Sequence, residues 1–117
     1  MVANGLLYLS KADVEAAALP PAELIARVED AYRLRAKGRM LTKPKLGLYT
    51  DGGNFFFSLA ACSEELGYAI THASMGTPLE KTLPGHHHIS SLEILIDAES
   101  AEPVAVKRTR SRRRNSS

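Results

Sequence analysis

The sequence is poor in the residues that stabilise very small domains through cross-links or large aromatic side chains. Among its 117 residues it has one cysteine, Cys62, no tryptophan and 6% aromatic residues. A single cysteine excludes an intramolecular disulfide, and we interpret Cys62 as a small apolar residue in a reduced interior. Any core must therefore be built mainly from leucine, isoleucine, valine and alanine.

Long apolar runs and nucleotide-binding motifs are also missing. No run approaches the roughly 18 apolar residues that cross a membrane, and residues 1–10 lack the basic and apolar regions of a signal peptide. The eight glycines form neither a GxGxxG nor a GxxxxGK[ST] pattern. We therefore expect a cytoplasmic protein with no membrane partner, and no Rossmann domain or phosphate-binding loop within this chain.

Positive charge is scarce except at the end of the chain. Residues 107–117 hold six of the fifteen Lys and Arg residues and no acidic residue. Residues 1–106 therefore carry nine basic and thirteen acidic side chains, a net charge of −4. A mildly acidic body makes nucleic acid an improbable partner. We expect residues 107–117 to form a basic, disordered tail.

The order of elements predicts an α+β fold, because helices come first and strands follow. The helices are expected over 11–19 and 22–38, with Ser10 and Asp13 forming a capping box before the first. We expect the helices to pack on a mostly antiparallel or mixed sheet. Its strands are expected over 5–10, 45–50, 55–61, 67–74, 89–97 and 103–106, with a polar connector over 39–45.

The helix over 22–38 has the clearest pattern. Leu24, Ile25, Val28 and Tyr32 recur at spacings of three and four residues and form one apolar face. Charged residues fall largely elsewhere and include two i,i+4 pairs in the favourable order, Glu23 with Arg27 and Glu29 with Arg33.

Two polar motifs could carry chemistry. His86–His88 is a poor metal site, because adjacent strand residues point to opposite faces and no carboxylate or cysteine lies at a workable spacing. We therefore predict no metal ion. Lys43-Pro44-Lys45 is either a solvated basic loop or a fixed cation for a substrate carboxylate.

Several segments in order resemble the N-terminal part of the ornithine cyclodeaminase/mu-crystallin family. The resemblance covers residues 6–106 and rests on the order and spacing of short motifs. They are LLYLS-KADV, PPAELIARVEDAYRLRAKGRM, KPK, GGNFFFSLAA, GYAITHAS, LPG and LEILIDAESAEPVAV.

The resemblance implies a dimeric enzyme that uses NAD(H) to transfer hydride at the α-carbon of an amino acid or imine. Examples are ornithine cyclodeaminases, which form proline and ammonia, ketimine reductases and some alanine dehydrogenases. In that family the N-terminal domain forms the dimer and most of the amino-acid pocket, and a second, Rossmann domain binds NAD(H). The present segment matches only the first of these.

The resemblance also assigns roles to particular residues. Lys45 matches a basic position that contacts the substrate carboxylate, and Lys43 is the second candidate. By our alignment Thr71 replaces a family lysine, and uncharged threonine cannot act as a general acid or base at neutral pH. Ser100-Ala101 replaces an expected Thr-Gly. We therefore assign no catalytic residue and no cofactor-binding residue to this chain.

After Val106 the sequence departs from the family and becomes rich in arginine and serine. Such a change is typical of an out-of-frame reading of a GC-rich gene. We therefore expect a domain over 1–106 that is incomplete and inactive alone. Its expected partners are an amino-acid-like molecule and either a second copy or a separate Rossmann-domain chain. The alternative is a non-catalytic module for dimerisation or small-molecule binding.

Overall fold

The computed structural model describes residues 2–3 and 5–111 and has an α+β fold with no Rossmann-like arrangement among them. Two α-helices and one short 3₁₀ helix accompany a mixed sheet of eight strands. The elements are β1 (Val2–Ala3), β2 (Leu6–Leu9), α1 (Lys11–Ala16), α2 (Pro21–Ala36), β3 (Leu41–Thr42), β4 (Leu46–Tyr49), β5 (Phe55–Ser63), β6 (Tyr68–Gly76), η1 (Leu79–Lys81), β7 (Ile89–Asp97) and β8 (Pro103–Arg110).

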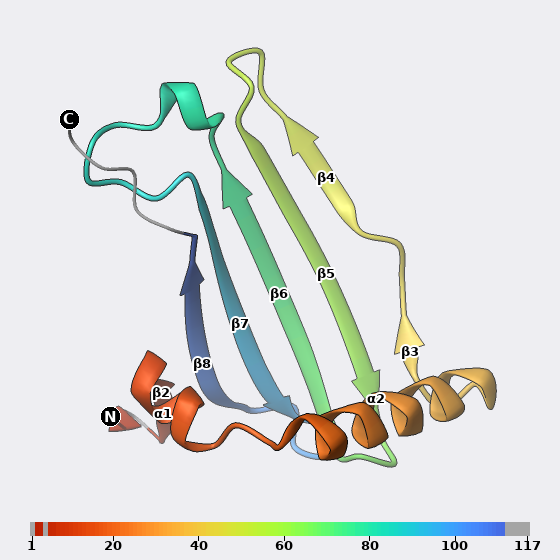
Figure 1. Ribbon diagram of the computed structural model, residues 1–117. Helices are drawn as coiled ribbons and strands as arrows, with labels where there is room; N and C mark the ends of the chain where they lie inside the picture. The colour runs from red at the N-terminus through yellow and green to blue at the C-terminus, as the bar shows by residue number, and fades with distance from the viewer. Residues whose placement is uncertain (1, 4, 112–117) are drawn as a thin grey trace.

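The sheet is built around a long antiparallel meander, in which β5, β6, β7 and β8 follow one another in sequence and in space (Figure 1). β3 and β4 both pair with β5 at one edge, and β2 pairs with β8 toward the other. The β2–β8 pairing is parallel and all other pairings are antiparallel. Consecutive strands joined by short turns therefore generate most of the sheet.

Local signals in the sequence mark the start of both helices to within one residue of the expected position, whereas α1 ends at Ala16, three residues before its expected end. Before α1, the Ser10 side chain accepts a hydrogen bond from the Asp13 backbone N–H at 3.1 Å, and Asp13 accepts one from the Ser10 N–H at 2.9 Å. Helix α2 begins at Pro21, where the missing N–H costs no helical hydrogen bond. Gly38 follows the end of α2 with φ +72°, a conformation that favours glycine.

The sequence expectation missed β1 and β3, and it ended β5 and β6 two residues early and β8 four residues early. Leu41 and Thr42, expected in a polar connector, form β3 because they pair with Cys62 and Ala61 at the free edge of β5. Residues 107–110, which the sequence assigns to the disordered tail, instead continue β8. They pair with β7 from Glu93 to Ser90. An available strand edge thus extends the ladder past Val106, and the remaining tail residues 112–117 lie outside the described residues.

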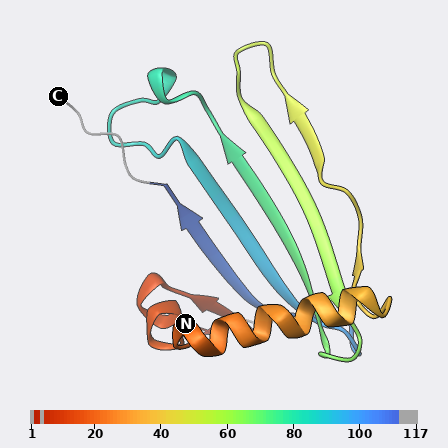
Figure 2. The same ribbon diagram turned by 45° about the vertical axis from the view of Figure 1, so that its right-hand side comes forward.

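The sheet has little covering. Ala105 is the one buried hydrophobic residue among those described, and the other buried residues are Ser63 and Thr82. Helix α2 crosses the end of the sheet where β5 and β7 finish (Figures 1 and 2), and none of its residues is buried. A surface ion pair between Arg39 and Glu65, at 3.4 Å, joins the segment after α2 to the β5–β6 turn.

The dimensions agree with this open arrangement. The Cα radius of gyration is 16.6 Å, whereas a compact domain of this length has about 13 Å. The chain exposes 9002 Å², against about 6,200 Å² for a compact monomer of this mass. Full exposure of the eight residues outside the described ranges would account for at most about 1,300 Å² of the difference. The rest is surface that a self-contained domain would cover.

Candidate substrate-binding site

Lys45 lies immediately before β4 and is exposed, with its side chain against an aromatic cluster. Its ammonium nitrogen is 4.6 Å from the centroid of the Phe57 ring, a cation–π distance. Phe57 in turn stacks on Phe55 at 4.8 Å and meets Tyr49 edge to face at 5.5 Å. Gly47 permits this arrangement, because a Cβ there would lie 2.8 Å from the Phe57 ring. The Lys45 charge is therefore directed over one face of the sheet.

A second group of charges lies on the same face. His72, Glu93 and Lys107 are directly paired residues on β6, β7 and β8. One Glu93 carboxylate oxygen is 3.2 Å from His72 Nδ1, and the other is 3.0 Å from Lys107 Nζ. All three side chains are partly buried, with 24–32% of each exposed. Burial of this kind strengthens a charge interaction relative to one on the open surface.

The strand register places Lys45 in the same row as these residues. Leu46 pairs with Ser58, so Lys45 stands opposite Leu59, and Leu59 pairs with His72. We call the face that carries Lys45, Phe57, His72, Glu93 and Lys107 the lysine face. Neighbouring strands are about 4.8 Å apart, so the row spans about 19 Å from Lys45 to Lys107 and a molecule the size of an amino acid would contact only part of it.

Thr71 lies on the other face of the sheet. It pairs with Ala60 and Ile94, and successive strand side chains point to opposite faces. His72, the next residue along β6, lies on the lysine face. Thr71 and Lys45 therefore lie on opposite faces of the sheet.

Lys43 is less well placed than Lys45. It lies between β3 and β4 and is exposed, as Lys45 is. The difference is the ring contact, which Lys45 makes with Phe57. Sequence reasoning found Lys43 and Lys45 but missed His72, Glu93 and Lys107. The sequence does not reveal that these residues share a row. They lie on three different strands, and only the pairing register of those strands brings them together.

The histidine triplet shows no metal-binding arrangement. The His87 Nδ1 atom contacts the Ser111 carbonyl oxygen, and the His88 carbonyl accepts a hydrogen bond from the Thr77 N–H at 2.9 Å. Within residues 2–3 and 5–111, no group of three or more His, Cys, Asp or Glu side chains could hold a metal ion. The triplet instead joins the β6–β7 loop to the end of β8.

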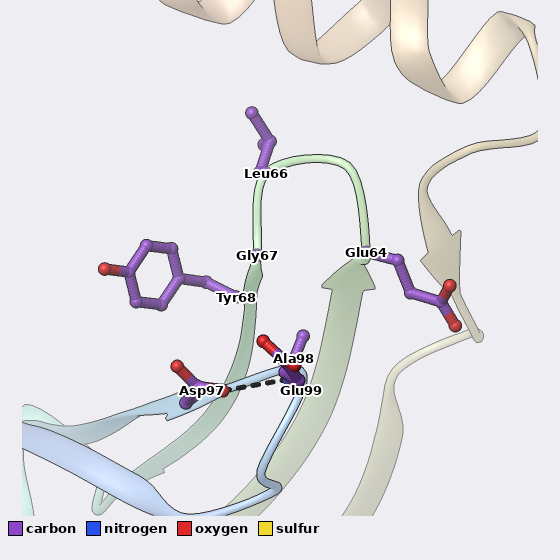
Figure 3. Close-up of a pocket in the computed structure, with 7 residues that line it drawn as sticks. All are labelled: Glu64, Leu66, Gly67, Tyr68, Asp97, Ala98 and Glu99. Carbon is purple, nitrogen blue, oxygen red and sulfur yellow. Dashed lines mark hydrogen bonds between the residues drawn. The ribbon is translucent and has the colours of Figure 1, made fainter.

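A concavity at the opposite end of the sheet lies between the β5–β6 and β7–β8 turns (Figure 3). It is lined by Glu64, Leu66, Gly67, Tyr68, Asp97, Ala98 and Glu99. The side chains of Glu64 and Tyr68 point away from each other (Figure 3). Asp97 accepts hydrogen bonds from the Ser100 and Glu99 N–H groups, which lower the pKa of its carboxyl. The Asp97 carboxylate therefore stabilises the turn between β7 and β8.

The described residues do not fit a dinucleotide. A dinucleotide-binding fold places a glycine-rich turn between a strand and a helix so that backbone N–H groups reach the pyrophosphate. Here no helix follows a strand through a glycine-rich turn within the described part of the chain. The same residues contain no helix that is both long and apolar enough to cross a membrane.

The α+β fold of this chain is similar to part of the fold of a solved reductase. The match is to Δ1-pyrroline-2-carboxylate reductase from Thermococcus litoralis, whose structure contains NADH and L-proline. The TM-score is 0.74 at 20% sequence identity, over 88% of this chain. The matched part is 32% of that reductase, so the present chain spans about a third of its length. No protein-family model and no curated protein sequence matches the chain.

Proposed function

We propose that this chain is the substrate-binding and pairing part of an enzyme of the ornithine cyclodeaminase/mu-crystallin type. Such an enzyme transfers hydride between NAD(H) and the α-carbon of an amino acid or imine, as in ketimine reduction or the conversion of ornithine to proline and ammonia. The fold match carries the proposal, since it covers 88% of the chain. The motifs that resemble the family lie within residues 6–106.

In this proposal Lys45 contacts the carboxylate of the substrate. Two observations support that role: the ammonium group lies over the Phe57 ring, and it shares a sheet face with three other ionisable side chains. A lysine ammonium in this position can form a charge-assisted hydrogen bond with a carboxylate that lies on the same face. Lys43, exposed in the connector, is the weaker candidate.

The cofactor would be held by residues other than those described, because no dinucleotide site fits them. We infer that a Rossmann domain, on a further segment or a separate chain, supplies NAD(H) and the hydride. The described part of the chain would bind and orient the amino acid or imine. We place this enzyme in the cytoplasm.

We also propose that the chain forms a homodimer through its uncovered apolar surface. Leu24, Ile25, Val28 and Tyr32 on α2 are each about half exposed or more. The sheet face that carries Thr71 also exposes Leu46, Leu48 and Phe56. Large apolar patches of this kind are rare on monomers and mark interaction surfaces.

The alternative is a non-catalytic module that dimerises or binds a small molecule. The exposed apolar surface supports a non-catalytic module and a part of an enzyme equally well. Both versions predict that the chain alone neither oxidises NADH with a cyclic imine nor releases ammonia from ornithine with NAD⁺. The two differ in whether a dinucleotide-binding partner restores turnover, and catalysis by the chain alone would contradict both.

The substrate assignment is tested by calorimetric titration of the purified chain with L-proline. We expect binding, and at least a tenfold loss of affinity in Lys45→Gln. The matched control is Lys37→Gln, which removes an exposed lysine at the end of α2 and should leave affinity unchanged. Equal affinity in wild type and Lys45→Gln would contradict the role of Lys45.

The family assignment is tested separately by reading the sequence of the gene. Reading all three frames beyond codon 106, together with the neighbouring genes, should reveal a glycine-rich strand–turn–helix of the dinucleotide-binding type. Such a sequence in another frame would also explain the basic tail. Its absence from every frame and neighbour would favour the non-catalytic module.

A further inference from the structure

Strand β8 extends beyond the strand that pairs with its outer edge. β2 pairs with β8 only from Ala105 to Lys107, because β2 ends at Leu9 and the chain turns into α1. β8 itself continues to Arg110 and stays paired with β7 on its inner side. Figures 1 and 2 show this part of β8 extending past α1 at the margin of the sheet. Among the described residues, no strand pairs with the outer side of β8 from Arg108 to Arg110, and we call this segment the β8 edge.

The backbone of the β8 edge has hydrogen-bonding groups that point outward. The Ser111 N–H donates to the Ile89 carbonyl of β7 at 2.8 Å. Successive residues of a strand direct their backbone groups alternately to one side and the other, so the N–H and C=O of Arg110 point away from β7. A strand edge of this kind can receive a further strand through main-chain hydrogen bonds.

The β8 edge also carries two cations without partners. Arg108 and Arg110 are both exposed, and they share one face of the strand because they lie at alternate positions. Neither forms an ion pair with any other residue in the part of the chain that the structure describes. The nearby Lys107, in contrast, pairs with Glu93 at 3.0 Å. The two guanidinium groups are therefore available to carboxylates of another molecule.

A concavity of about 1000 Å³ lies beside the β8 edge and is predominantly basic. It is bounded by α1, the end of β2 and the β6–β7 loop, and its charged lining consists of four cations and one carboxylate: Lys11, Lys107, Arg108, Arg110 and Glu15. The described lining has no Phe, Tyr or Trp on which the bases of a single-stranded nucleic acid would stack. A second copy of the same edge would bring like charges together, which is unfavourable across paired strands. These features favour an acidic polypeptide as the occupant.

We propose that the β8 edge binds an extended acidic segment of another protein as an added strand. The main chain of that segment pairs with β8 in line with β2, and two acidic side chains at alternate positions pair with Arg108 and Arg110. Main-chain hydrogen bonds supply affinity, and the alternation of acidic residues supplies specificity. The inference does not depend on the substrate, because the two arginines lie on the face opposite Lys107 and the lysine face.

The test is a ¹H–¹⁵N NMR titration of the full chain with three capped five-residue peptides. Thr-Glu-Thr-Glu-Thr has both acidic side chains on one face of a strand. Thr-Thr-Glu-Glu-Thr has the same composition and charge, but its acidic side chains point to opposite faces. Thr-Gln-Thr-Gln-Thr keeps the alternation without the charge. We expect the first peptide to bind about fivefold more tightly than either of the others, because it alone pairs two carboxylates with the two arginines.

The same titration locates the bound peptide. The amide signals of Arg108, Thr109 and Arg110 should shift, and hydrogen exchange at the Arg110 amide should slow. Equal affinity of the two acidic peptides would indicate attraction by charge alone and would overturn the proposal, as would no binding. Tighter binding of a deoxythymidine oligomer at these amides, or concentration-dependent shifts of the same signals without peptide, would overturn it in favour of nucleic acid or a second copy.

The decisive variant combines Arg108→Gln with Arg110→Gln and should abolish the preference between the two acidic peptides. Its matched control combines Arg35→Gln with Lys37→Gln, which removes two exposed cations at the end of α2 and should keep the preference. A preference that survives in the β8 variant, or that disappears in the control, would overturn the role of the two arginines. Should the β8 variant fail to fold, the peptide comparison in the wild-type chain still decides the question.

Discussion

At the scale of single residues, the turn between β7 and β8 contains the main departure from favourable backbone geometry. Ala101 has φ +61°, and it is the one non-glycine residue with positive φ among those described. For a residue with a Cβ, this conformation costs about 1–2 kcal/mol of conformational free energy. The resemblance to the cyclodeaminase family expects glycine here, and the structure supplies the physical reason for that preference.

Ala101→Gly should therefore stabilise the chain by about 1 kcal/mol, since it relieves the steric cost at positive φ. Chemical denaturation measures this change as a shift in midpoint. Ala98→Gly in the same turn is the control, because Ala98 does not have positive φ, and it should destabilise by about 0.5–1 kcal/mol. A lower midpoint for Ala101→Gly would contradict the account.

A second prediction at this scale concerns acid. Hydrogen bonds from the Ser100 and Glu99 N–H groups lower the folded-state pKa of Asp97 below its ordinary value. A depressed pKa contributes stability above the unfolded pKa, and this contribution is lost as the pH falls through the folded value. Asp97→Asn should therefore flatten the dependence of stability on pH below about pH 5. An unchanged slope in denaturation curves measured down to pH 2 would contradict this assignment.

Most individual elements could be predicted from the sequence, because their signals are local. The capping box at Ser10, proline at the first position of α2, and glycine after its end each act within a few residues. β7 was expected over residues 89–97 and forms over the same residues. The extension of β8 could not be predicted, because it depends on the partner strand and not on the composition of KRTR.

The candidate site was only partly predictable for the same reason. Lys45 belongs to a short motif, so the sequence revealed it. His72, Glu93 and Lys107 lie on three strands, and their contacts depend on register. A one-residue change in register moves a side chain to the other face, so the composition of each strand alone does not show that these three side chains share a face.

At the scale of elements, α2 is a helix whose apolar side stays largely exposed in the described part of the chain. Its surface ion pairs, such as Glu29 with Arg33 at 3.6 Å, are largely exposed and contribute little stability. A 16-residue helix of this kind is only marginally stable without packing. We therefore expect its apolar side to be covered in the assembled protein.

Val28→Asp tests this expectation by placing a charge in the middle of the apolar side. It should weaken dimerisation at least tenfold, since a buried unpaired charge is costly. Ala26→Asp adds the same charge on the polar side of α2 and should leave dimerisation unchanged. Sedimentation equilibrium compares the two, and equal dissociation constants would exclude α2 from the interface.

At the scale of the whole molecule, the described chain is a sheet with two largely uncovered faces. A surface excess of at least about 1,500 Å² over a compact monomer is comparable with the area that stable protein interfaces bury. We expect sedimentation velocity of the purified chain to show a dimer at micromolar concentration. A compact monomer as the only species would contradict the pairing role.

The central claim is that the lysine face binds the amino acid or imine. The most direct test is a ¹H–¹⁵N NMR titration of the full chain with L-proline. The account predicts that the shifted amide signals cluster on the central parts of β4 to β8, around Lys45, His72 and Glu93. Shifts centred on the concavity at Asp97 and Glu99, or no shifts at all, would contradict it.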